Sequence, residues 1–241
     1  IVEAISKEIT LSEFTTSSSI TTTAIGEIEE PGKEIISTLY FGGGTPSILR
    51  IDELQLLFKA LKKRFVFAGD IEITLEANPD DISDTKLKEW KSLGINRLSV
   101  GIQSFVEDEL KWMNRAHTSV DSVKGADFTN FSVDLIYGSP ILSDAEWKRN
   151  VDIIIQKNIP HISCYALTVE PKTALDKMIM QHKKQPIDPE KQARQFLLLM
   201  EWMEKAGYEH YEISNFAKPG LRSKHNSSYW LGESYYGFGP S

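Results

Sequence analysis

Polar residues and glycines stand at the ends of several apolar segments of this 241-residue chain. In order, these ends carry Gly42-Gly43-Gly44-Thr45, Glu76, Gln103, Asp134 and Tyr165-Ala166. The carboxyl ends of parallel strands share one edge of a sheet, and ligands of parallel α/β folds gather there. We therefore expect these residues to converge on one binding site, an arrangement that core packing alone would not require.

Two carboxylates are the most informative of these residues. Glu76 lies in LEANP, inside an otherwise apolar segment, and Asp134 has the same position in VDLIYG. Because a carboxylate buried without a partner is costly, we expect both to face a ligand that carries hydroxyl and ammonium groups. Gln103 in GIQSF is equally typical of a hydrogen bond that fixes a loop.

The three glycines allow two interpretations. Glycine lets a ligand lie against main-chain N–H and C=O groups, and it also supplies the positive φ of a tight turn from strand to helix. Both remain open on the residues alone. A phosphate loop is disfavoured, since neither GxxxxGK[ST] nor GxGxxG is present.

Other residues with chemical potential are less specific. Cys164 is the only cysteine, and its apolar strand favours a small buried side chain. Arg115 in NRAH is typical of a surface ion pair. His225 in KHNSSYW, next to Tyr229 and Trp230, fits either a loop fixed by its aromatic residues or an axial ligand of a flat ring.

The elements that must position these residues alternate along the chain. Apolar runs of strand length recur about every 30 residues, the length of a βαβ unit. These predicted strands span residues 35–41, 71–77, 96–102, 130–138 and 161–169. They are mostly apolar, as strands covered on both faces are. Their alternation with helix patterns predicts an α/β fold with a parallel sheet, either doubly wound or curled into a barrel.

The helix patterns between the strands have recognisable ends. We expect one helix to begin at Asp52 with Gln55 three residues on, and another at Ser143 with Glu146 in the capping-box position. A third begins at Asp188-Pro189 and ends at Gly207, and a fourth runs from near Asp84 to Gly94. The Ser/Thr-rich residues 15–23 predict a loop, residues 117–129 only a weak helix, and the stretch from Tyr229 on a loop.

Composition narrows the class of protein. The net charge of −7 argues against a nucleic-acid partner. A single cysteine fits a reducing compartment. The chain has no apolar run long enough to span a membrane, and its first residues, IVEAISKEI, carry charges where a signal peptide is apolar. We therefore predict a cytoplasmic protein with no transmembrane segment.

Several segments, in this order, resemble one family: YFGGGTPS, ITLEANPDD, GINRLSVGIQSF, NRAH, SVDLIYGSP, HISCYALTVEPKT, YEISNFAKPG, KHNSSYW and GFGPS. They are similar to the radical S-adenosylmethionine (SAM) proteins related to oxygen-independent coproporphyrinogen III oxidase, above all to the HemW-like branch of haem chaperones. The resemblance implies an incomplete (β/α)6 TIM barrel over residues 37–215. It also implies the start of a HemW-type carboxyl-terminal region over 216–241, after a poorly matched segment 1–36.

The resemblance also implies roles for single residues. Those that would meet the methionyl end of SAM, through backbone and hydroxyl groups, are Gly43, Gly44 and Thr45. Those that would hold the remainder of SAM are Glu76, Gln103, Arg115 and Asp134, with Ala166 against the adenine. His225 to Trp230 matches the HNxxYW signature of haem binding, which makes His225 the expected haem ligand.

The function implied by the resemblance is that of a haem chaperone that binds haem, SAM and a [4Fe-4S] cluster. Its partners would be haem or porphyrin, haem-receiving proteins and an electron donor. Two alternatives stay open. One is an oxygen-independent coproporphyrinogen III oxidase, an oxidoreductase that decarboxylates propionates, and the other is a cluster-free module that binds only a nucleoside or tetrapyrrole. Whether the chain is an enzyme stays open with them.

One part of the family pattern is absent. Three cysteines of a CxxxCxxC loop would bind the cluster, and this chain has Cys164 alone. We therefore predict no metal ligand within the chain. We hypothesise that the cluster loop has been lost between the start of the chain and residue 37, with a degenerate relative that binds no cluster as the alternative.

Overall fold

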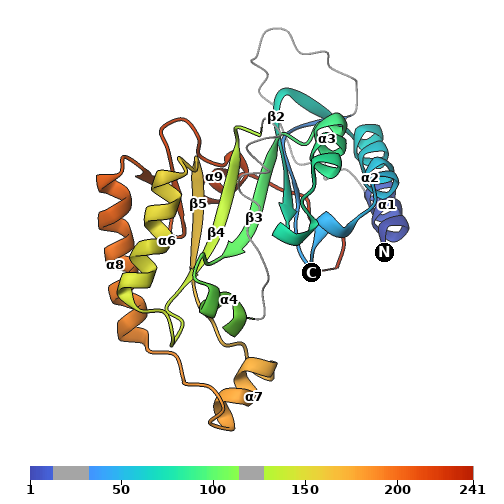
Figure 1. The fold of residues 1–241 in the computed structure, drawn as a ribbon. Helices are drawn as coiled ribbons and strands as arrows, with labels where there is room; N and C mark the ends of the chain where they lie inside the picture. Colours follow the sequence, from blue (N-terminus) through green and yellow to red (C-terminus); the bar gives the residue numbers. More distant parts are fainter. Residues whose placement is uncertain (13–32, 114–127, 241) are drawn as a thin grey trace.

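The computed structural model describes residues 1–12, 33–113 and 128–240. Within them, seven strands form one curled sheet in the order β1-β2-β3-β4-β5-β7-β6 (Figure 1). The strands are β1 (Glu34–Phe41), β2 (Phe65–Ala77), β3 (Arg97–Gln103), β4 (Phe131–Tyr137), β5 (His161–Ala166), β6 (Glu209–His210) and β7 (Asn215–Ala217). Neighbours among β1 to β5 are parallel, while β7 is antiparallel to both β5 and β6. The predicted incomplete barrel of parallel strands is thus confirmed, with a short antiparallel edge that the sequence did not indicate.

The helices of the described residues mostly cover the outer face of this sheet or extend beyond its ends (Figure 1). They are α1 (Val2–Leu11), α2 (Ile51–Arg64), α3 (Asp84–Leu93), α4 (Glu107–Trp112), α6 (Asp144–Gln156), α7 (Ala174–Met180), α8 (Pro189–Lys205) and α9 (Lys224–Leu231). Helix α1 packs on α2 through Val2 and Ile9, so the start of the chain adds to the outer layer. Each of these helices is too short or too polar to serve as a membrane span.

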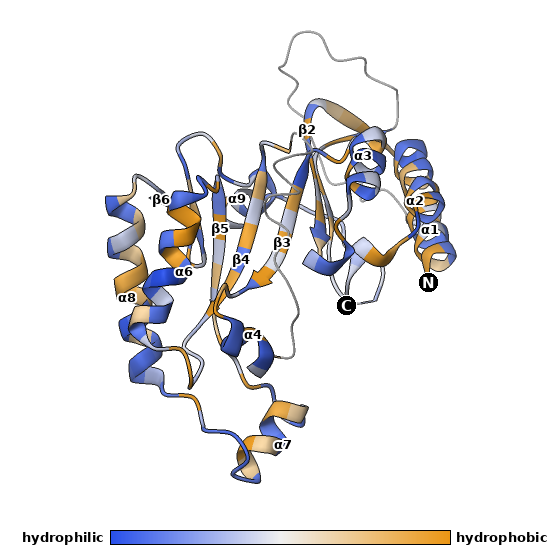
Figure 2. Ribbon diagram, in the orientation of Figure 1, coloured by the Kyte–Doolittle hydropathy of each residue, from blue (hydrophilic) through white to orange (hydrophobic). Residues whose placement is uncertain are grey.

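The hydrophobic core lies between the outer face of the sheet and the helices. Side chains of a strand alternate between its two faces, and in β3 the outward set is Leu98, Val100 and Ile102. Trp90 of α3 and Trp147 of α6 are fully buried against this layer. The helices are accordingly striped with apolar and polar residues (Figure 2).

The inner face of the sheet is polar, and here the expectation of strands covered on both faces is wrong. The inward set of β3 begins with Arg97 and Ser99, and β4 and β5 continue it with Ser132 and Ser163. The core helices α3 and α6 pack against the outer face, whereas α9 lies on the inner side, where its Asn226 contributes to a cavity. The core helices thus leave the inner face free to form a binding surface.

Most helix ends follow the predicted signals. Ser143 and Glu146 form a reciprocal capping box at the start of α6, and Asp188 accepts N–H groups at the start of α8. Gly94 ends α3 in the left-handed conformation, with φ of 100°. The segment from Tyr229 on is partly helical rather than a loop, since Tyr229 lies within α9.

Two boundaries differ from prediction. Helix α2 begins at Ile51 with Arg50 as its N-cap, because the Arg50 backbone N–H bonds to Glu53 and closes the capping box two residues before Asp52. Strand β2 begins at Phe65, six residues before the predicted strand at 71, because its extra residues pair with β1 across a register shift near Ile36. Residues 15–23 and nearly all of 117–129 lie outside the described residues.

Candidate functional site

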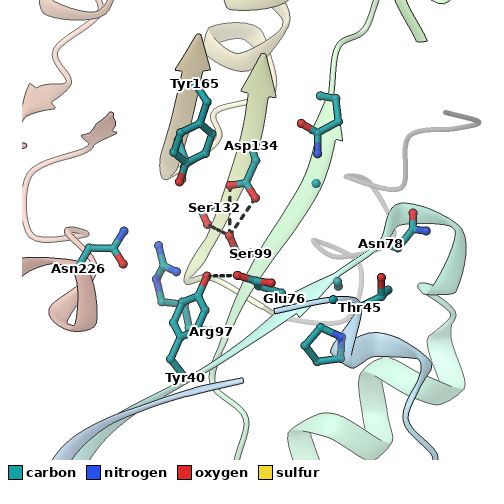
Figure 3. Close-up of a pocket in the computed structure, with 16 residues that line it drawn as sticks. Tyr40, Thr45, Glu76, Asn78, Arg97, Ser99, Ser132, Asp134, Tyr165 and Asn226 are labelled. Atoms are coloured by element: carbon teal, nitrogen blue, oxygen red, sulfur yellow. Dashed lines mark hydrogen bonds between the residues drawn. The ribbon is translucent and has the colours of Figure 1, made fainter. Parts of the chain in front are cut away.

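A cavity of about 380 Å³ opens on the polar inner face, and residues from β1 to β5 line it (Figure 3). Six of the residues predicted from the strand ends are among them: Gly44, Thr45, Glu76, Gln103, Asp134 and Tyr165. Their convergence follows from topology, because each lies at or just beyond the carboxyl-terminal half of a parallel strand. Residues that lie up to 121 positions apart in the sequence thus share one polar pocket.

The other predicted site residues do not line the cavity or are not described by the structure. Gly43 lies beside the cavity and bonds to Glu76. Ala166 ends β5 and is not part of the cavity lining, whereas its neighbour Tyr165 is. Arg115 lies outside the described residues, so its predicted role stays a prediction.

The glycine run after β1 has two structural causes. A side chain at Gly42 would place its Cβ 2.6 Å from Cε1 of Tyr40 and 2.9 Å from Oε1 of Glu76, so either side chain would have to move away from its place at the site. Gly43 and Gly44 have φ of 78° and 64°, the left-handed conformation that glycine adopts readily. The interpretation as a tight turn therefore holds, and the turn also aims the Gly43 N–H at the site.

Glu76 is held in place by two donors. The Tyr40 hydroxyl donates to Oε1 at 2.8 Å, and the Gly43 backbone N–H donates to Oε2 at 3.1 Å. Burial, and then the nearby charge of Glu76, raise the pKa of Tyr40 well above its usual range. Tyr40 therefore remains a protonated donor, and the carboxylate keeps a fixed orientation at the cavity wall.

Asp134 lies deeper, among serine hydroxyls. The Ser99 hydroxyl is 3.2 Å from Oδ1 and 3.3 Å from Oδ2, and the Ser132 hydroxyl donates to Ser99 at 2.9 Å. Burial raises the pKa of Asp134 to about 6, against the lowering effect of the hydroxyls of Ser163 and Ser99. Near neutral pH this carboxyl can hold or release a proton while it contacts a ligand.

Gln103 has an unusual backbone. Its φ of 70° lies in the left-handed region, which is uncommon for residues other than glycine. Its side chain folds back over Gly101, where a Cβ would approach Nε2 to 2.8 Å. Strained conformations of this kind are typical of functional sites, and Gln103 is one of the residues that line the cavity.

Helix α9 brings His225 next to the cavity. Ser223 caps the helix by accepting the Asn226 N–H, and Glu72 of β2 accepts from the backbone N–H groups of Lys224 and His225 at 3.1 and 3.0 Å. The Ser223 hydroxyl also donates to Glu72. A buried carboxylate thus binds the amino-terminal end of α9, which favours negative charge.

The His225 ring is oriented from three sides. It stacks on Tyr40 with ring centroids 4.8 Å apart, its Nδ1 lies 3.0 Å from the Thr38 hydroxyl, and the Tyr229 ring meets it edge-on. Burial lowers the pKa of His225, so the imidazole is neutral at pH 7. If Nδ1–H donates to Thr38, the lone pair of Nε2 is available to a metal.

Comparison with known proteins places this arrangement in a family. Residues 18–179 match the family model of the Radical SAM superfamily. The chain belongs to the radical SAM superfamily. The match begins at residue 18, upstream of the residue 37 at which the sequence motifs begin.

Curated relatives of the chain within this superfamily carry one name. "Heme chaperone HemW" of Bacillus subtilis (strain 168) is 36% identical over 222 residues, which cover 89% of this chain and 59% of that protein. "Heme chaperone HemW" of Escherichia coli (strain K12) is 34% identical over 216 residues, 86% of this chain and 55% of that protein. The chain thus spans a little over half the length of these relatives.

Solved structures share the radical SAM fold with this chain. Coproporphyrinogen III oxidase (HemN) from Escherichia coli, a radical SAM enzyme, matches with a TM-score of 0.69 at 24% identity, over 82% of this chain and 46% of that one. Elp3 of Methanocaldococcus infernus matches with a TM-score of 0.52 at 19% identity, over 73% and 45%. At these identities the likeness speaks for the fold alone.

Membership of the radical SAM superfamily implies SAM and a [4Fe-4S] cluster, and the chain fits only the first. The cavity offers carboxylates, hydroxyls and an amide to a polar nucleoside. A cluster needs cysteine thiolates, and Cys164 is 2% exposed within β5, where burial raises the pKa of its thiol. The described residues include no group of three or more His, Cys, Asp or Glu side chains suited to a metal.

Sequence reasoning missed several residues of this cavity. They are Tyr40, Arg97, Ser99, Ser132 and Asn226. A signal for part of them was present, because NRLSVGIQ alternates polar and apolar residues as a strand with one polar face does. No sequence pattern predicts that Asn226 lines the cavity, since its position depends on how α9 packs against the inner face of the sheet.

Proposed function

We propose that the chain is the SAM- and haem-binding part of a haem chaperone of the HemW type. One observation carries the proposal: the imidazole of His225, in the HNxxYW sequence, stacks on Tyr40, which lines the same cavity as Glu76 and Asp134. The name shared by the curated relatives supports the chaperone over the oxidase. The oxidase is represented by HemN, whose 24% identity supports only the fold.

SAM binds, in this proposal, along the inner face at the carboxyl ends of the strands. The turn of Gly43, Gly44 and Thr45 contacts its methionyl end, and Glu76, Gln103 and Asp134 accept or donate hydrogen bonds to its hydroxyl and amino groups. Ala166 and Arg115 complete the site, against the adenine and a charged group. Bound SAM supplies a sulfonium and an adenosyl group, while these residues orient it and exclude water.

Haem is the cargo, and His225 is its axial ligand. Three contacts support this role: the Thr38 hydroxyl fixes one ring nitrogen, Tyr40 supports one face of the ring, and Glu72 holds the helix that carries it. The lowered pKa of His225 keeps the imidazole neutral, as a haem ligand must be. Tyr229 and Trp230 are exposed on α9, where they can flank a flat macrocycle.

The remaining assignments follow from the same proposal. Residues 37–215 form the partial barrel, 216–241 begin the haem-binding region, and 1–36 precede both. A haem-receiving protein and an electron donor are the partners, and the cytoplasm is the site of action. No step that passes through an iron–sulfur cluster is assigned to these 241 residues, because they hold no thiolate set for one.

A haem titration tests the proposal. We expect haem to bind the wild-type protein with a shift of the Soret band, and His225→Ala to weaken binding about tenfold or more through loss of the axial bond. His210→Ala is the matched control, because His210 is exposed on β6 and stacks on Phe216, away from the cavity. Equal binding by wild type and His225→Ala would reject His225 as the ligand. Turnover of coproporphyrinogen III without haem uptake would instead favour the oxidase.

A further inference from the structure

Arg97 is a buried cation at the floor of the cavity. Arg97 is only 1% exposed, yet it lines the cavity together with Tyr40 and Asn226 (Figure 3). Its Nε and Nη2 atoms have no hydrogen-bond partner among the described residues. Nothing assigned to the SAM or haem site above uses this guanidinium.

Unpaired donors of this kind are expensive. A buried polar group that lacks a hydrogen bond loses its solvation without compensation, and the loss is greater for a charged group. Glu72 compensates the charge in part, but its Oε2 lies 3.8 Å from Nε, beyond hydrogen-bond distance. The oxygens of Glu72 are engaged by the start of α9 instead. The guanidinium of Arg97 thus has N–H donors available for an acceptor that the described residues do not supply.

The surroundings of Arg97 suit one small acceptor. Its register partner on β2 is Thr74, whose buried hydroxyl also has no hydrogen-bond partner among the described residues. One layer further along the strands stand the hydroxyls of Ser99 and Ser132. Planar guanidinium donors with hydroxyls beside them match the two oxygens of a carboxylate.

The charge of the cavity distinguishes a carboxylate from a phosphate. Glu76 and Asp134 line the same cavity, and Arg97 is the one arginine or lysine side chain of its described lining. A dianionic phosphate would bring two negative charges beside Glu76 and Asp134 with a single cation to oppose them, whereas a monoanion brings only one and is repelled less. We propose that Arg97 is a carboxylate-binding residue and that the floor of this cavity receives the carboxylate of an acidic ligand.

Both ligands of the proposed function carry a carboxylate. The identity of the bound ligand therefore rests on the proposed function, whereas the binding of a carboxylate by Arg97 does not. SAM carries one α-carboxylate, and a tetrapyrrole carries propionates. The shared chemistry is a monocarboxylate, and propionate itself is the simplest probe of it. The first experiment therefore uses neither cofactor.

In that experiment the Nε–H resonance of Arg97 is followed by NMR while propionate is added to the wild-type protein. We expect the resonance to shift and saturate with propionate, and to stay in place with uncharged propionamide at the same ionic strength. A resonance that does not respond to propionate would overturn the proposal, even if SAM and haem bind. A response to propionate with no binding of SAM or haem would uphold the carboxylate site and reject the proposed function.

Variants then identify the source of the carboxylate. If the methionyl end of SAM reaches the floor of the cavity, Arg97→Gln should lower the affinity for SAM about tenfold. The affinity for 5′-methylthioadenosine, which lacks the carboxylate, should then stay unchanged. If a haem propionate reaches the floor instead, Arg97→Gln should lower the affinity for haem and leave the affinity for haem dimethyl ester unchanged. Equal loss of both members of each pair, or no loss in either, would mean that Arg97 has only a structural role.

Arg97→Gln leaves Glu72 buried without its cation, so folding needs its own control. The double variant Glu72→Gln with Arg97→Gln removes both charges, so no buried charge is left unpaired, and it must show the same ligand discrimination as the single variant. Arg64→Gln changes another buried arginine that lies outside the cavity lining, and should leave every ligand affinity unchanged.

Discussion

The Oε1 atom of Glu72 accepts the backbone N–H of His225 at 3.0 Å, across 153 positions of the chain. This bond joins the inner face of β2, which also carries Glu76, to the first turn of α9. The side chain of His225 then returns to β1 through Thr38 and Tyr40. The helix with the proposed haem ligand is thus part of the cavity wall rather than an independent element.

Glu72→Ala should loosen α9. The change removes three acceptor bonds and leaves Arg97 buried without its counter-charge, so we expect the free energy of unfolding to fall by about 3 kcal/mol, with faster hydrogen exchange in α9. Urea unfolding and exchange measured by mass spectrometry check this. Asp70→Ala is the control, because Asp70 contacts Lys224 of the same helix at an exposed position. If the two variants behave alike, the buried contact does not hold the helix.

Tyr40→Phe should separate the two proposed ligands. It removes the hydroxyl that orients Glu76 but keeps the ring that stacks on His225. We expect SAM affinity to fall about tenfold, since the lost bond is to a charged group, and haem affinity to be unchanged. Calorimetry with SAM and a Soret titration with haem measure the two effects. Tyr236→Phe, which loses a bond to Glu34 outside the cavity, should change neither; a loss of SAM affinity there would show that the effect is not local.

Asp134→Asn should change how stability depends on pH. The folded protein raises the pKa of Asp134 from 3.8 to about 6, so it binds this proton more tightly than the unfolded chain does. The favourable contribution is complete below pH 4 and is lost as the pH rises to about 6, a difference of up to about 3 kcal/mol. Asparagine carries no such proton, and the variant should therefore gain stability over wild type between pH 4 and pH 7. Parallel pH profiles of the two proteins in urea unfolding would contradict the raised pKa.

The 241-residue chain should not bind a [4Fe-4S] cluster after anaerobic incubation with iron and sulfide. Cys164 is its only thiol, and it is buried in β5. We expect wild type and Cys164→Ala to show the same iron content after desalting and the same visible spectrum. A stoichiometric cluster in the wild type that is absent from Cys164→Ala would mean that this residue is a ligand, and the structure of β5 around it would then be wrong.

The sequence predicts the site to the extent that topology determines it. Glu76, Gln103 and Asp134 were expected together because the ends of parallel strands share one edge, and they line one cavity. The alternation of polar and apolar residues in NRLSVGIQ indicates that Arg97 points to the inner face. The mostly apolar composition of the predicted strands instead favours a sheet covered on both faces. Periodicity was the better guide than composition here.

Long-range docking is what the sequence did not show. The bond between Glu72 and α9 and the stacking of His225 on Tyr40 depend on a helix that follows the last strand and returns to the first ones. No local pattern specifies such a return. Ser223, which caps the helix, is a local signal that favours it, whereas the aromatic residues that follow favour a loop.

The central claim is that the polar inner face of the half-barrel binds SAM beside His225. A crystal structure of the protein with SAM tests it most directly. The account predicts SAM in the cavity, with its methionyl end at Gly43 to Thr45 and its nucleoside within hydrogen-bond distance of Glu76, Gln103 or Asp134. Density for SAM on another surface, with only water on the inner face, would contradict it.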